Sequence, residues 1–152
     1  MTKPKLSVIL PGIRAHNWLS FYDRLEDSYD DEFELIIISP YELPTTLKDA
    51  PDIVHIQDWG SPARCQQIGL VHATGKYVTW GADDGYFLEG KLTEAVELLE
   101  ASATSEKDIV TCKYIEGSGT ALYDDHMRTD EYYKINFSKG LQAKFIPDDF
   151  WI

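Results

Sequence analysis

The sequence is poor in basic residues. It holds 14 Lys and Arg against 26 Asp and Glu, which gives a formal net charge of -12 at pH 7. This balance argues against nucleic acid or an anionic membrane surface as the main partner, because both carry negative charge. An anionic ligand would therefore need a local basic site or a metal ion.

Cysteine and long apolar runs are scarce as well. Cys65 and Cys112 stand far apart and outside any metal-ligand spacing, so we expect buried thiols in a reducing compartment. The apolar run that follows the first five residues is too short for a signal peptide or a membrane span. The sequence therefore predicts a cytoplasmic protein without an integral membrane segment.

Apolar residues are still abundant enough for a core. The chain has 152 residues, of which 43% are hydrophobic, and this suits one compact domain better than two. We therefore predict a single domain over residues 1–152.

Strand and helix patterns alternate along most of the chain. Short apolar segments closed by Pro or Gly predict strands, and apolar residues at helical spacing predict helices. The expected strands are 6–10, 33–38, 53–56, 76–80 and 109–115, and the expected helices are 17–29, 61–75 and 91–103. Asn17 and Ser61 are the expected helix caps, with Pro62 at the favoured first position. The alternation predicts a Rossmann-like α/β fold with a mostly parallel sheet flanked by helices, and an irregular or antiparallel C-terminal segment from Glu116 onward.

The fourth expected strand ends in two adjacent carboxylates. Tyr77 to Trp80 lead into Gly81-Ala82-Asp83-Asp84-Gly85, and open α/β folds bind their ligands at the carboxyl ends of strands. Two neighbouring Asp side chains repel each other when both are ionised, and a divalent cation or a shared proton would relieve the repulsion. The alternative is a solvated turn, since Asp and Gly are ordinary turn residues.

Trp59 stands between Asp58 and Gly60, after the third expected strand. We expect its ring to pack beside the sheet, and stacking on a nucleotide base is the alternative.

Three segments together resemble a known enzyme family. They are Val8-Ile9-Leu10-Pro11, Glu34-Leu35-Ile36-Ile37-Ile38, and the stretch from Gly69 to Asp84. They resemble the nucleotide-sugar-binding half of family 2 glycosyltransferases of the GT-A fold, whose pattern has an Ile-Ile-Pro opening, a Glu-Ile-Ile-Val second strand and an Asp-x-Asp metal motif. The likeness covers about residues 6–115. It implies a nucleotide-sugar-binding half over 1–115 and the start of an acceptor half over 116–152.

The resemblance also implies site residues and a reaction. Asp83 and Asp84 would form a site for Mn²⁺ or Mg²⁺, and the cation would stabilise charge on the leaving nucleoside diphosphate. A sugar would pass, with inversion, from a UDP- or GDP-linked donor to the hydroxyl of a saccharide or another acceptor. The implied nucleotide-binding residues are Pro11, Gly12, Ile13, Ser39, Arg64 and Ala82.

The chain departs from the family pattern at several places. Gly81 replaces the first Asp of Asp-x-Asp, and Ser39-Pro40 replaces the usual acidic pair after the second strand. In the family, the catalytic base lies in a second half that continues well beyond the length of this chain, so no catalytic residue is assigned. The alternative interpretation is a nucleotide-sugar-binding module, or a catalytically silent truncated fragment.

Overall fold

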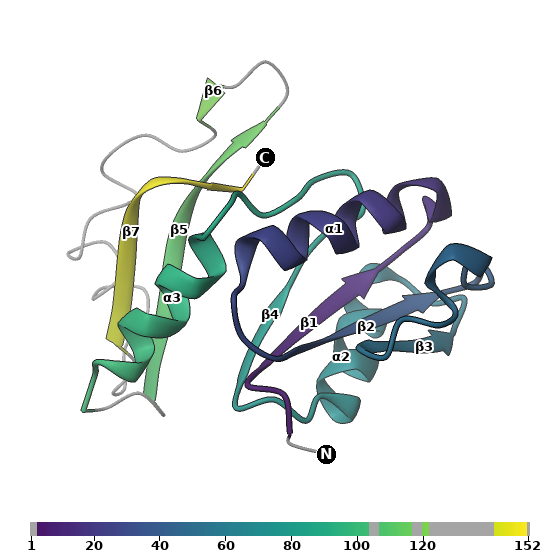
Figure 1. Cartoon of the computed structure of the whole chain (residues 1–152), viewed down its shortest axis with the longest axis horizontal. Coiled ribbons are helices and arrows are strands. Elements are labelled where there is room, and N and C mark those ends of the chain that lie inside the picture. The colour runs from purple at the N-terminus through teal and green to yellow at the C-terminus, as the bar shows by residue number, and fades with distance from the viewer. Residues whose placement is uncertain (1–2, 104–106, 117–119, 122–141, 152) are drawn as a thin grey trace. The chain divides into compact units, whose positions relative to one another are not determined.

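The computed structural model of the chain describes residues 3–103, 107–116, 120–121 and 142–151 (Figure 1). The chain forms two compact units, Met1–Tyr86 and Phe87–Ile152. Each unit is described by itself.

The first unit is built on a four-stranded parallel sheet. Its strands run in the spatial order β3-β2-β1-β4. They are β1 (Leu6–Pro11), β2 (Phe33–Ser39), β3 (Ile53–Gln57) and β4 (Tyr77–Trp80). Strands β1 and β2 are almost wholly buried, as continuous apolar strands covered on both faces should be. The predicted Rossmann-like α/β fold is thereby confirmed.

Two helices cover the two faces of this sheet (Figure 1). Helix α1 (Trp18–Ser28) places the ring of Trp18 beside that of His55 on β3, with centroids 6.4 Å apart. Helix α2 (Pro62–His72) contributes Cys65 to a buried cluster on its own face of the sheet. The cluster also contains Ile9 of β1 and Ile36 and Ile38 of β2. Short 3₁₀ turns at Ala15–Asn17 and Thr45–Leu47 complete the connections.

Helix α2 lies unusually close to the sheet at Gly69. A methyl group placed there would be 2.4 Å from Cγ2 of Ile9 and 3.2 Å from Cδ1 of Ile38. Any side chain would therefore push the helix off the strands, and glycine allows the close packing.

The two predicted helix caps, Asn17 and Ser61, differ in how they act in the structure. Ser61 caps α2 as predicted, with its hydroxyl accepting from the backbone N–H of Arg64 at 3.3 Å, and Pro62 is the first helical residue. Asn17 stands at the N-cap position of α1 as predicted, but its side chain makes no capping bond. Its amide Nδ2 donates instead to the backbone oxygen of Asp83, 2.8 Å away.

The second unit has its own three-stranded sheet in the order β6-β5-β7. Its elements are α3 (Lys91–Glu100), β5 (Asp108–Glu116), β6 (Thr120–Ala121) and β7 (Gln142–Trp151). The predicted helix and the strand at 109–115 are present, but that strand does not extend the four-stranded sheet. The expected antiparallel pairing occurs between β5 and β6, whereas β7 lies parallel to β5. The parallel pairing of β7 with β5 joins residues far apart in the chain, so local sequence patterns do not predict it.

Two expectations from composition can be compared with the described residues. Cys65 is buried as predicted, and burial raises the pKa of its thiol, while the side chain of Cys112 lies outside the described part. Within the described residues, no helix combines the length and the apolar character needed to span a membrane.

Candidate functional site

The loops after β1 and β4 meet at the carboxyl edge of the four-stranded sheet. From β1 the chain passes to β2 on one side, whereas β4 pairs with β1 on the other side. The gap between the ends of β1 and β4 is therefore the point where the strand order reverses. Open α/β sheets bind ligands at such a point, because the diverging loops leave a crevice there.

Asp83 joins these two loops. Its Oδ2 accepts the backbone N–H groups of Ile13 at 2.7 Å and Arg14 at 2.6 Å, and the indole Nε1–H of Trp18 at 3.2 Å. Its Oδ1 accepts Nη1 of Arg14 at 2.9 Å, and its backbone oxygen accepts from Asn17. Only 3% of the Asp83 side chain is exposed. The carboxylate is thus an anchor for the loop that follows β1.

Gly12 makes this arrangement sterically possible. Its backbone N–H donates to the oxygen of Ile38 at 2.9 Å, which holds the loop start against β2. A methyl group at Gly12 would lie 2.8 Å from two atoms of the Trp18 indole. Only glycine lets the chain pass over that ring and still present the next two N–H groups to Asp83.

The hydrogen bonds keep Asp83 ionised. Burial by itself would raise the pKa of this carboxyl. The bonds donated by Arg14, Ile13 and Trp18 outweigh that effect and hold the pKa below its ordinary value. The carboxylate is therefore charged at neutral pH and is neutralised by the guanidinium of Arg14.

Asp84 lies in a different environment from Asp83. Its side chain is 61% exposed, and its Oδ2 is 3.9 Å from Nη2 of Arg14, which is an ion-pair distance but not a hydrogen bond. Ala82 is exposed in the same turn, and its oxygen accepts the N–H of Gly85. Of the two predicted metal ligands, Asp84 faces solvent and Asp83 faces the protein.

The predicted metal site does not fit the geometry of Asp83. Oδ2 of Asp83 accepts three hydrogen bonds, and Oδ1 accepts one from the guanidinium of Arg14. A metal ion could reach this nearly buried carboxylate only beside that cation. Among the described residues, no group of three or more His, Cys, Asp or Glu side chains is placed to hold a metal ion.

The remaining predicted nucleotide-binding residues follow the ends of β1, β2 and β3. Pro11 ends β1 and is half-buried, while the side chain of Ile13 projects into solvent. Ser39 ends β2 and is fully buried, with its hydroxyl accepting the N–H of Tyr41 at 3.1 Å. Ser39 therefore shapes the loop, and Ile13 is open to a ligand.

Arg64 lies on the first turn of α2 and pairs with Asp58. Its Nε and Nη2 each lie 3.0 Å from a carboxylate oxygen of Asp58, a forked arrangement on the surface. Trp59 is 75% exposed, so its predicted packing beside the sheet is wrong. The N–H of the following residue, Gly60, donates to Oδ1 of Asp58 at 2.8 Å.

Sequence reasoning missed several residues of this edge. Arg14, Asn17 and Trp18 all contact Asp83 across more than 60 positions of sequence. No local pattern marks such contacts. The available signal was the general one that a buried carboxylate needs a cation and several donors, and Arg14 is the basic residue nearest the end of the first strand.

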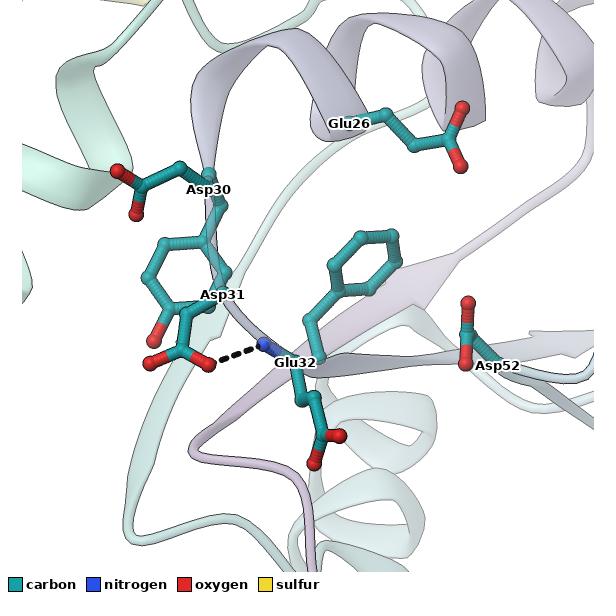
Figure 2. Close-up of a pocket in the computed structure, with 7 residues that line it drawn as sticks. Glu26, Asp30, Asp31, Glu32 and Asp52 are labelled. Carbon is teal, nitrogen blue, oxygen red and sulfur yellow. Dashed lines mark hydrogen bonds between the residues drawn. The ribbon is translucent and has the colours of Figure 1, made fainter.

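A separate hollow of about 520 Å³ lies at the opposite edge of the sheet (Figure 2). It occupies the end of α1 and the starts of β2 and β3, so it is remote from the carboxyl ends of the strands. Five carboxylates surround it, and they would repel an anionic nucleotide. Its lining residues are Glu26, Tyr29, Asp30, Asp31, Glu32, Phe33 and Asp52.

Comparison with solved structures shows what the fold is similar to. The crystal structure of S. aureus TarS 1-349 superposes on 97% of this chain with a TM-score of 0.65 and 14% sequence identity. The fold is glycosyltransferase-like. A second crystal structure of S. aureus TarS superposes on 76% of the chain with a TM-score of 0.57 and 20% identity. No protein-family model matches the sequence, and no curated protein is significantly similar to it.

The glycosyltransferase-like neighbours are longer than this chain. The matched region spans 59% of TarS 1-349 and 23% of the longer TarS structure. At this level of identity, the likeness supports the fold and leaves the donor, the metal dependence and the stereochemistry to experiment.

Proposed function

We propose that this chain binds a nucleotide-diphosphate sugar at the carboxyl edge of the four-stranded sheet and takes part in transferring the sugar to an acceptor hydroxyl. The observation that supports this best is the joining of the loops after β1 and β4 by Asp83 at the point where the strand order reverses. The glycosyltransferase-like fold agrees with it.

In this proposal the edge offers separate places for the base and the phosphates. Ile13, Ala82 and Trp59 are exposed, and the ring of Trp59 suits stacking on a base. Pro11 and Gly12 form the floor beside β1, and Ser39 supports the neighbouring loop from within. Arg64 would meet the nucleotide by exchanging its forked ion pair with Asp58 for the phosphates.

The reaction itself would be an in-line displacement. The acceptor oxygen attacks the anomeric carbon and its hydroxyl proton passes to solvent, while the bond from that carbon to the diphosphate oxygen breaks and the configuration inverts. The leaving diphosphate gains negative charge, which preorganised positive groups stabilise. The Mn²⁺ or Mg²⁺ site at Asp83 and Asp84 stays a prediction, and since Asp83 does not fit it, no step is derived through the ion.

A second candidate is nucleotide-sugar binding without turnover. Two carboxylates of this edge, Asp58 and Asp83, already accept hydrogen bonds from arginine. Neither is free to take a proton from an acceptor hydroxyl. Asp84 is the exposed carboxylate of this edge, so the binding-only candidate requires that Asp84 does not take that proton.

Calorimetric titration of the chain with UDP, GDP and CDP, each with and without Mn²⁺, tests the shared binding step. We expect one of the three nucleotides to bind. The release of nucleoside diphosphate from the matching sugar donor, measured with an acceptor present, then separates the transferase from the binding module. Failure of all three nucleotides to bind under both conditions would contradict both candidates.

A further inference from the structure

Asp83 is poorly suited to bind a second cation. Three donors converge on Oδ2 and one on Oδ1, and the side chain is nearly inaccessible. A divalent ion at Asp83 would have to displace Arg14 or break the bonds that hold the loop. It would also lie a few ångströms from a guanidinium of like charge, which is unfavourable in a partly buried site.

Arg14 has donors to spare at the same place. Its guanidinium carries five N–H groups, and 42% of its side chain is exposed. Nη1 binds Asp83 at 2.9 Å, while Nη2 is 3.9 Å from Asp84 and so forms no hydrogen bond with it. The side chain is therefore held at one corner and can present its other N–H groups outward.

The position of Arg14 suits a diphosphate. The residue follows β1 at the carboxyl edge, where the strand order reverses, and a guanidinium binds phosphate oxygens in a forked, bidentate manner. The surrounding protein is strongly acidic. A fixed cation at this edge provides the local basic site that an anionic ligand needs on a protein with a negative net charge.

We propose that Arg14 is the phosphate-binding cation of this site and that Asp83 is a positioning residue that holds it, so that nucleoside diphosphate binding does not require a divalent metal. This inference rests on the proposed function. It departs from the metal role that the sequence predicts for Asp83.

The test compares nucleotide affinity in the full chain with and without metal. Wild type, Arg14→Gln and Arg14→Lys are titrated with the nucleoside diphosphate that binds best, in EDTA and in Mn²⁺. Lys5→Gln is the matched control, because Lys5 is also a cation in an ion pair, with Asp31 at 2.9 Å, but it precedes β1 at the opposite edge. Circular dichroism of each variant confirms that it is folded.

We expect wild type and Lys5→Gln to bind equally well in EDTA and in Mn²⁺. Arg14→Gln should lose roughly 10-fold or more in affinity, the range for a lost hydrogen bond to a charged group. Arg14→Lys should recover part of that loss, since it keeps the charge without the fork. The corresponding nucleoside, which has no phosphate, should bind wild type and Arg14→Gln alike.

Several results would overturn the inference. If Mn²⁺ raises wild-type affinity sharply and Asp83→Asn removes that gain, Asp83 is a metal ligand, and the proposed nucleotide site still stands. If Arg14→Gln binds as wild type does, Arg14 is not the phosphate cation. If no nucleotide binds wild type under either condition, the proposed function fails and this inference fails with it.

A readout without nucleotide tests the positioning role of Asp83. We expect Asp83→Asn to speed amide hydrogen exchange at Ile13 and Arg14, because the bonds from these two N–H groups lose their charged acceptor. We also expect Mn²⁺ alone to leave the Asp83 side-chain resonance of wild type unbroadened. Broadening at Asp83 at low Mn²⁺ concentration, or unchanged exchange in Asp83→Asn, would contradict the anchor role.

Discussion

Replacing Gly12 by alanine tests whether the loop after β1 depends on close passage over the Trp18 indole. The added methyl group would lie 2.8 Å from Nε1 and Cζ2 of Trp18 and 2.9 Å from Cε2. Ordinary contacts between such atoms are about 3.5–4.0 Å, so the loop and the ring must separate by roughly 0.7 Å. Trp18 is fully buried, so moving its ring would disturb the neighbouring core.

The cost of this change follows from overpacking and from weaker anchoring. Forcing an extra methyl group into a packed site costs about 1–3 kcal/mol. Movement of the loop also lengthens the bonds that Ile13 and Arg14 donate to Asp83, now 2.7 and 2.6 Å. We therefore expect Gly12→Ala to lower the free energy of unfolding by about 2–3 kcal/mol.

Two measurements check this prediction. Urea unfolding followed by circular dichroism measures the loss of stability, and amide hydrogen exchange at Ile13 and Arg14 reports the loop directly. Ser20→Ala, an exposed position on the same helix as Trp18, is the control and should change neither. An unfolding free energy and exchange rates equal to those of wild type would refute the steric reasoning.

Three further predictions concern the same unit. Glu34→Gln should lower stability by about 1 kcal/mol near neutral pH, because it removes the charge that strengthens the bonds accepted by Oε1 of Glu34, among them the N–H of Thr74 at 2.6 Å. Burial acts to raise the pKa of Glu34, but the hydrogen bonds to its carboxylate outweigh burial and lower the pKa. The stability that Glu34 contributes is thus complete above the ordinary Glu pKa, and it is lost as the pH falls through the pKa of Glu34 in the folded state. Wild type should lose more stability on acidification than Glu34→Gln in urea unfolding between about pH 7 and pH 3, and parallel curves would contradict this. Trp59→Ala should weaken nucleotide binding roughly 10-fold through lost stacking without changing the unfolding curve, and unchanged calorimetric affinity would exclude a base platform there. Arg64→Ala should weaken nucleotide binding whereas Asp58→Ala, which frees Arg64, should not; equal affinity in both variants would remove Arg64 from the site.

Much of the first unit can be predicted from local sequence because its signals are local. The runs Leu6–Pro11 and Phe33–Ser39 have no polar alternation, and both form central strands buried on two faces. Ser61 and Pro62 define a helix start within two residues. The alternation of such strands and helices predicts a parallel sheet, since the connections are long enough to cross over it.

The candidate site could be predicted only in part. The sequence predicts a site at the ends of β1 and β4, because Pro11-Gly12 and Asp83-Asp84 interrupt apolar runs there, and the structure joins these two loops. The sequence does not distinguish the two aspartates. Asp83 is buried under the loop and Asp84 is open to solvent, although they are neighbours in the chain and chemically identical.

The sequence by itself thus determined the strands of the four-stranded sheet and the helices α1, α2 and α3, because each depends on periodicity or on turn residues within a few positions. Only the tertiary structure decided that Arg14, Asn17 and Trp18 converge on Asp83, that Trp59 projects into solvent, and that β7 lies parallel to β5. These features join residues far apart in the chain, and their energies come from burial and hydrogen bonding that exist only after the strands have assembled.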